Sequence, residues 1–230
     1  MSRIPISILP AAASAQWDPP DYPDGVTSDP IAHWDAAYAQ GDTTRSWYQG
    51  EAATSAALLS AAGVTPEAAV IDVGGGASTL VDGLLTAGFT ALTVLDISPL
   101  SLDLAQQRLG PARAGQVTWV VADILAWTPD RTYDVWHDRA VLHFMTTEHD
   151  RVRYRRALVA ATAPGSVAIF GVFGPQGPEA CSGLATRRYD ADDIADFLGS
   201  DFHVEATELH THHTPAGADQ QFLWARAVRR

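Results

Sequence analysis

Three aspartates, each near the carboxyl end of an apolar run, are the residues of this chain best placed to bind a ligand. Asp72 lies inside the first run, and Asp96 and Asp123 follow the next two, 91–95 and 117–121. Short apolar runs separated by helix-like stretches indicate parallel strands, and ligands bind at the carboxyl ends of such strands. We therefore expect the three carboxylates to accept hydrogen bonds from a single ligand.

A glycine-rich turn, Gly74-Gly75-Gly76-Ala77-Ser78, follows the first strand. Glycines allow a tight turn with no side chain in the way, and the helical pattern after it ends at Gly88. A dinucleotide-binding turn would need a third glycine where Thr79 stands, and the carboxylate of Asp72 would repel a phosphate. The turn therefore favours a ligand with an amino group near Asp72.

The string Asp72-x-Gly74-x-Gly76 resembles the first motif of the class I methyltransferases that use S-adenosylmethionine (SAM), with Ser78 in place of the third small residue. The resemblance extends over about residues 31–230. Three segments resemble those of one group of bacterial enzymes in this family: WHDRAVLHF (136–144), CSGLATRRYD (181–190) and HHTPAGADQQFLWA (212–225).

This resemblance implies a role for each residue at the strand ends. Asp96 would accept hydrogen bonds from the ribose hydroxyls, as acids at this place do in other nucleotide-binding folds. Asp123 would accept from the adenine amino group, with Ile97 and Ile124 on either side of the ring. Trp47 lies in an aromatic loop before the first core strand, where it could face the sulfonium of SAM or pack between a helix and the sheet.

The candidate catalytic residues follow the fourth strand, 133–136. His137 and His143 have pKa values suited to a general base, and Asp138 could orient an acceptor amine or take its proton. His137 is also a candidate contact of SAM. The alternatives are a histidine bonded to backbone and a structural ion pair between Asp138 and Arg139. Methyl transfer chiefly needs alignment, and a base only where the acceptor must lose a proton.

Two other groups of residues invite a chemical interpretation. His210 and His212 share a face of a predicted strand, but no third metal ligand is near them, so we expect no metal site. Cys181 is the single cysteine, which excludes an intrachain disulfide, and Ser182 and Gly183 beside it suggest the lining of a pocket.

Composition limits the classes of partner. The formal net charge is −12 and no basic block is present, a poor match to nucleic acid or anionic lipid. No apolar run reaches the roughly 18 residues of a membrane helix, and the N-terminal apolar segment is too short for a signal peptide. We therefore expect a cytoplasmic protein with a small-molecule acceptor.

The elements that must position these residues form an α/β pattern. Residues 1–30 are proline-rich and are predicted to be a flexible N-terminal arm or lid, and 31–230 a single class I methyltransferase domain. We expect a Rossmann-like, mostly parallel seven-strand sheet in the order 3-2-1-4-5-7-6, the last strand antiparallel, with helices on both faces. The predicted strands are 69–73, 91–95, 117–121, 133–136, 167–173, 202–209 and 220–228. The predicted helices are 31–39, 51–62, one after the glycine turn, 98–110, 147–161 and 190–198.

The predicted function is transfer of a methyl group from SAM to a small molecule by in-line displacement, which releases S-adenosylhomocysteine (SAH). A protein methyltransferase acting on lysine or an N-terminus is the alternative, although Asp138-Arg139-Ala140 replaces the Asp-Lys-Gly common in the seven-strand lysine enzymes. More distant alternatives are a catalytically silent SAM-binding module and a nicotinamide-dependent oxidoreductase.

Overall fold

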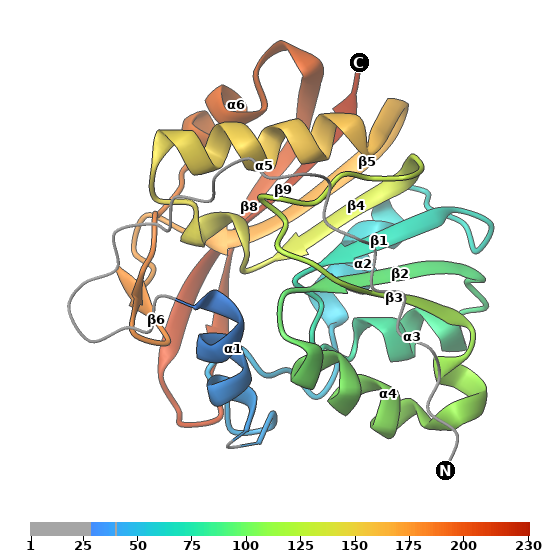
Figure 1. Cartoon of the computed structure of the whole chain (residues 1–230). Helices are drawn as coiled ribbons and strands as arrows, with labels where there is room; N and C mark the ends of the chain where they lie inside the picture. The colour runs from blue at the N-terminus through green and yellow to red at the C-terminus, as the bar shows by residue number, and fades with distance from the viewer. Residues whose placement is uncertain (1–28, 40) are drawn as a thin grey trace.

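The computed structural model describes residues 29–39 and 41–230, and Figure 1 shows a central sheet with helices on both sides. Most of the predicted arm, residues 1–28, lies outside this part of the chain. Its last two residues instead begin helix α1 (Pro30–Tyr38), because Asp29 Oδ1 accepts a hydrogen bond from Ile31 N at 3.0 Å and caps the helix.

The seven-strand sheet has the order β3-β2-β1-β4-β5-β9-β8. This confirms the predicted order 3-2-1-4-5-7-6, because β6 and β7 form a separate sheet and β8 and β9 are therefore the sixth and seventh strands of the main one. β9 pairs antiparallel with its neighbours β5 and β8, and the other pairs are parallel. The strands are β1 (Ala69–Val73), β2 (Ala91–Asp96), β3 (Val117–Val121), β4 (Tyr133–Arg139), β5 (Thr162–Phe173), β8 (Phe202–His213) and β9 (Asp219–Arg229).

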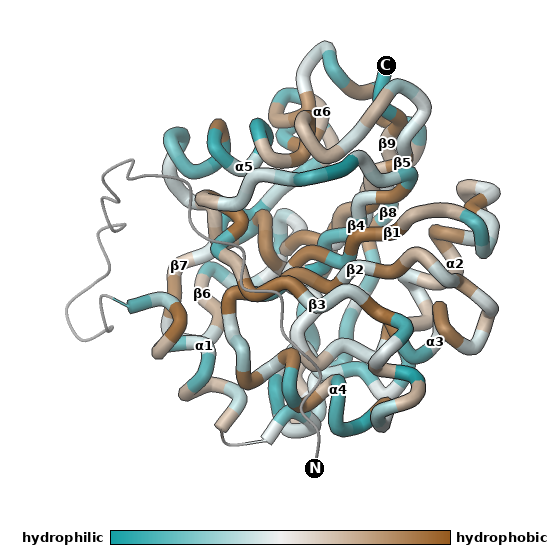
Figure 2. Tube along the Cα trace, turned by 45° about the vertical axis from the view of Figure 1, so that its right-hand side comes forward, coloured by the Kyte–Doolittle hydropathy of each residue, from teal (hydrophilic) through white to brown (hydrophobic). Residues whose placement is uncertain are grey.

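Apolar side chains on both faces of the sheet hold the helices in place. Helices α2 (Ala53–Ala61), α3 (Leu80–Thr86) and α4 (Pro99–Ala114) pack on one face, and α5 (Glu148–Ala160) and α6 (Ala191–Leu198) on the other. All five residues of β1 are buried, as a parallel strand covered on both faces requires. Figure 2 shows this as a hydrophobic band through the central strands. No helix in the described part of the chain is long and apolar enough to cross a bilayer.

The predicted helix starts are confirmed where a side chain caps them. Ser98 Oγ accepts from Ser101 N at 3.1 Å, and Asp190 forms a reciprocal capping box with Asp193. The predicted end of α4 at Gly110 is only an interruption. The φ of Gly110, +73°, breaks the helix there, and the helix then continues to Ala114.

Two other boundaries differ from the prediction. β4 runs three residues further, to Arg139, because neighbouring groups satisfy the polar atoms of His137 and Asp138 inside the core. β5 begins at Thr162 and not at the predicted residue 167, so Pro164 and Gly165 lie within it. The loop after β5 contains a short hairpin, β6 (Ala180–Cys181) and β7 (Leu184–Ala185).

Candidate functional site

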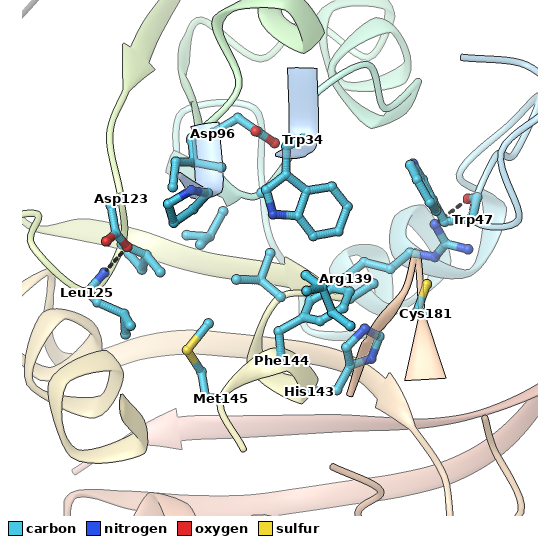
Figure 3. A pocket seen from close by; sticks show the side chains of 18 of the residues that line it. Trp34, Trp47, Asp96, Asp123, Leu125, Arg139, His143, Phe144, Met145 and Cys181 are labelled. Carbon is cyan, nitrogen blue, oxygen red and sulfur yellow. Dashed lines mark hydrogen bonds between the residues drawn. The ribbon is translucent and has the colours of Figure 1, made fainter. Parts of the chain in front are cut away.

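Three neighbouring cavities that share Arg139, at the end of β4, lie beside one another. The main cavity, of about 220 Å³, is lined by residues that follow β1 to β4, by α1 and by the hairpin β6–β7 (Figure 3). A small cavity of about 50 Å³ adjoins it and shares Tyr38, Trp47, Gly74 and Arg139 with it. An outer cavity of about 540 Å³, near the tip of the β8–β9 hairpin, shares Arg139 and Phe222 with the main cavity.

Four of the residues predicted to hold the nucleoside line the main cavity together. They are Asp96, Ile97, Asp123 and Ile124. Asp96 is buried, and its Oδ1 accepts from Ser98 N at 2.8 Å. Burial raises the pKa of Asp96 to about 7. Asp123 Oδ1 accepts from Leu125 N at 2.8 Å (Figure 3), and burial raises the pKa of this carboxyl as well.

Asp72 lies in the small cavity and not in the main one. Its Oδ1 is 2.7 Å from Nδ1 of His137, on the neighbouring strand β4. The other ring nitrogen of His137 is 2.9 Å from Ser55 Oγ on α2. The second oxygen of Asp72, Oδ2, is buried without a hydrogen-bond partner in the described part of the chain. It can therefore accept a hydrogen bond from a ligand.

The glycine turn brings backbone close to these acids. A Cβ on Gly74 (φ +64°) would lie 2.0 Å from Val141 Cγ2. A Cβ on Gly76 (φ +45°) would lie 2.7 Å from Tyr38 Oη and 3.0 Å from Asp96 Oδ2. Only glycine fits at both places, and the turn passes directly beside Asp96.

His137 and Asp138, two of the predicted catalytic residues, lie outside the main cavity. Both are buried, and His137 lines the small cavity together with Asp72. Asp138 accepts hydrogen bonds from the hydroxyl of Tyr154 and from the backbone N–H groups of Val141 and Leu142. It therefore fixes the turn after β4, and the guanidinium of Arg139 binds Trp47 O instead of forming the alternative ion pair with Asp138. His137 binds Asp72 through Nδ1 and Ser55 through Nε2, so both ring nitrogens are engaged.

His143, the third predicted catalytic residue, lines the main cavity, where its ring presents a hydrogen-bond donor. Its Nδ1 accepts a hydrogen bond from Phe173 N at 3.3 Å, so the ring proton is on Nε2. Burial, with a contribution from the charge of Arg139, lowers the pKa of His143 to about 3. The neutral ring therefore presents an N–H group and no free lone pair.

The sequence interpretation missed most of the aromatic residues around the cavity. Trp34 on α1 makes edge contacts with Trp47, at 6.0 Å between ring centroids, and with Phe144, at 5.1 Å. Tyr38 contacts Trp47 from the next turn of α1, at 5.9 Å. Trp34 and Tyr38 lie four residues apart on α1, a spacing that places them on one helix face but does not reveal what that face covers. Phe222, on β9, carried no local signal, because only the long-range pairing of β9 with β5 brings it here.

Arg139 is the other residue whose place the sequence did not reveal. It is the only Arg or Lys among the described residues that line the three cavities. Its Nη1 donates to Trp47 O at 2.8 Å (Figure 3), and its Nη2 is buried without a partner in the described part of the chain. Its guanidinium lies 5.2 Å from the ring centroid of Phe222.

The histidines of the β8–β9 hairpin have other partners. His212 Nε2 lies 2.7 Å from Ser46 O, and His210 Nε2 lies 3.1 Å from Glu208 Oε1. Among the residues that the structure describes, no group of three or more His, Cys, Asp or Glu could hold a metal ion. Cys181 lines the main cavity, and burial raises the pKa of its thiol.

Comparisons with known proteins agree with this geometry. Residues 70–165 match the family model of a methyltransferase domain. No curated protein sequence matches the chain. A solved structure described by the conversion of a disulfide bond into a thioacetal group during echinomycin biosynthesis is 24% identical, with a TM-score of 0.66, and the match covers 86% of this chain and 92% of that one.

Two further similar structures were solved with SAM or its product. The magnesium protoporphyrin IX methyltransferase of Synechocystis, with bound SAM, is 24% identical, with a TM-score of 0.61 and 77% of each chain covered. The N-methyltransferase NodS of Bradyrhizobium japonicum, with SAH, is 21% identical, with a TM-score of 0.60 and coverage of 76% of this chain and 84% of that one. These likenesses show the class I methyltransferase fold.

Proposed function

We propose that this chain is a SAM-dependent methyltransferase of the class I, Rossmann-like type, which methylates a small-molecule acceptor by in-line displacement and releases SAH. The observation that carries this proposal is the shared cavity of Asp96, Ile97, Asp123 and Ile124 beside the glycine turn.

The residues present fit SAM. The buried carboxylate of Asp96 can accept from the ribose hydroxyls, and Asp123, between Ile97 and Ile124 in sequence, can accept from the adenine amino group. The unpartnered Oδ2 of Asp72 suits the ammonium group of the methionine moiety. Trp47 lines both the main and the small cavity, where a π face attracts a sulfonium cation.

Bound SAM supplies a methyl group already activated by its sulfonium. The work left to the chain is to bind, to align and to exclude water. The ring contacts among Trp34, Trp47 and Phe144 cover the main cavity from the side of α1 and keep it apolar. Because His143 is a donor and both nitrogens of His137 are engaged, neither histidine supplies a general base, and an acceptor with a lone pair of its own suits this site.

A small acceptor suits this cavity better than a polypeptide. The covering helix α1 and the hairpin β6–β7, which contributes Cys181 and Leu184, both line the space beside the strand ends. A peptide chain would have to displace one of them. The similar structures with named small acceptors, such as the magnesium protoporphyrin enzyme, point the same way.

Calorimetry with SAH and SAM tests the proposal. We expect both to bind, and Asp96→Asn to weaken SAH binding about tenfold or more, because a buried hydrogen bond to a charged group is lost. Asp103→Asn is the matched control, since Asp103 is exposed on α4 and lines no cavity. Absence of SAH binding by the unmodified protein would overturn the proposal. Binding without methyl transfer to any extract fraction of small molecules would favour the silent module.

A further inference from the structure

Two buried N–H groups at the main cavity lack hydrogen-bond partners in the described part of the chain, Nε2 of His143 and Nη2 of Arg139. A buried donor without a partner costs free energy, which a ligand atom that accepts the hydrogen bond recovers. Both groups are donors, so the ligand atoms that match them are acceptors.

The protonation of His143 is fixed by its surroundings. Its ring stacks on Phe173 at 4.2 Å between centroids, and Nδ1 is occupied by the backbone N–H of the same residue. The nearby positive charge of Arg139 and burial both oppose a second proton. His143 therefore keeps one proton, on Nε2, throughout the neutral range of pH.

Arg139 supplies a charge that no carboxylate of the described chain neutralises by direct contact. Its Nη1 is bound to the backbone oxygen of Trp47, and its ring contact is with Phe222. Burial lowers the pKa of Arg139 only to about 10, so the guanidinium stays protonated at neutral pH. A buried cation of this kind favours an anion within reach of its free N–H groups.

We propose that the acceptor is a small apolar carboxylic acid in its ionised form, whose carboxylate is held by Arg139 and His143. One carboxylate oxygen then forms the new O–CH3 bond, the bond between the methyl carbon and the sulfonium sulfur breaks with its electron pair on sulfur, and the products are a methyl ester and SAH. The inference rests on the proposed function and adds the class of acceptor. Phe144, Phe173 and Phe222 line the same cavity and suit the apolar part of such a molecule.

The carboxylate could also come from the methionine end of SAM, because Arg139 lines the small cavity beside Asp72 as well. His143 lines the main cavity and not the small one. A carboxylate shared by both donors is therefore that of the acceptor, and the experiment below separates the two sources.

The test is calorimetric titration of SAH-saturated protein with three carboxylates, benzoate, phenylacetate and cinnamate, against their three neutral amides. We expect at least one carboxylate to bind about tenfold or more tightly than its amide, since only the anion can pair with the guanidinium. Arg139→Gln should remove this preference, and its loss of carboxylate affinity should exceed any loss of SAH affinity. Arg139→Lys, which keeps the charge, should retain part of it.

His143 needs a readout that a merely structural role would not change. In a long-range ¹H–¹⁵N spectrum we expect Nε2 to be protonated from pH 6 to 8 and its signal to move when the bound carboxylate is added. His143→Gln, which keeps an N–H donor, should bind the carboxylate better than His143→Phe.

Three outcomes would overturn the inference. They are equal binding of carboxylates and amides, a His143 ring protonated on Nδ1, and an Arg139→Gln variant that loses SAH while its carboxylate preference persists. The last result would assign Arg139 to the carboxylate of SAM. Failure of the unmodified protein to bind SAH is a separate result, because it contradicts the proposed function itself.

Discussion

The side chain of His137 holds Asp72 across two neighbouring strands, with 2.7 Å between Nδ1 and Oδ1, while Ser55 Oγ lies 2.9 Å from Nε2 on the opposite side of the ring. Asp72 is thereby fixed with one oxygen satisfied and the other, Oδ2, left for a ligand. His137, with both ring nitrogens engaged in this way, is a positioning residue for Asp72. The same contacts satisfy polar atoms of both side chains, which is how His137 and Asp72 are accommodated in the core of the sheet.

His137→Ala should weaken SAH binding about three- to tenfold, because Asp72 loses the partner that orients it, and lower the free energy of unfolding by about 1–3 kcal/mol. Calorimetry and denaturant unfolding measure the two effects. His149→Ala is the control, since that side chain is 72% exposed and lies on α5 far from the acid in the chain. Unchanged SAH affinity in His137→Ala would contradict the positioning role.

Asp138→Asn tests whether Asp138 has the predicted catalytic role or only holds the turn after β4. The amide still accepts one backbone hydrogen bond, but it meets the Tyr154 hydroxyl and two N–H groups less well than a carboxylate does. We expect a loss of about 1–3 kcal/mol in unfolding free energy and an SAH affinity within about threefold of the unmodified protein. A stable variant that binds SAH normally but has lost all transferase activity would instead restore the catalytic role.

Gly74→Ala and Gly83→Ala should change stability in opposite directions. At Gly74 the φ of +64° and a Cβ 2.0 Å from Val141 Cγ2 leave no room, so we expect a loss of several kcal/mol, about 3 or more. At Gly83, inside α3, a Cβ has no neighbour within 4 Å, and alanine should stabilise the helix by about 0.5–1 kcal/mol. Thermal unfolding of the two variants checks both signs.

The sequence predicted the parallel strands and the capped helices well because their signals are local. An apolar run, a capping serine and a glycine turn each act within a few residues, as at Ser98 and Gly74. The end of β4 was missed because its polar residues are satisfied from far away in the chain: Ser55 and Asp72 bind His137, and Tyr154 binds Asp138.

The site was predicted in part for the same reason. Asp96 and Asp123 follow their strands in sequence, so the sheet alone places them at one edge. The role of His143 depends on the backbone N–H of Phe173, and the roles of Arg139 and Phe222 depend on contacts between segments distant in the chain. No local pattern contains those contacts.

SAH binding should strengthen as the pH rises through about 7. Burial raises the pKa of Asp96 to about 7, so the free protein holds this proton at pH 6, whereas the ribose hydroxyls donate to the ionised carboxylate. We expect the dissociation constant at pH 6 to be up to about tenfold higher than at pH 8. The unfolded chain releases the same proton near pH 4, so ionising Asp96 also lowers the stability of the free protein between about pH 4 and 7.

Asp96→Asn provides the control for this pH dependence, because the amide does not titrate. Its SAH binding should be weaker than that of the unmodified protein and nearly flat from pH 6 to 8. A flat profile in the unmodified protein, or a slope that persists in the variant, would assign the titration to another group.

Trp47→Leu should separate SAM from SAH. Trp47 lies at the junction of the main and small cavities, and Arg139 binds its backbone oxygen, so the variant removes the ring and leaves that hydrogen bond. A cation over an aromatic face gains about 1 kcal/mol, which SAM has and the uncharged thioether of SAH lacks. We therefore expect the variant to lose roughly fivefold more affinity for SAM than for SAH, measured by calorimetry with both ligands.

Trp34→Leu is the matched control. Trp34 lines the main cavity but neither of the other two, so its replacement should change the affinities for SAM and SAH by the same factor. Equal losses in Trp47→Leu would mean that Trp47 has only a packing role, against Trp34 and Tyr38.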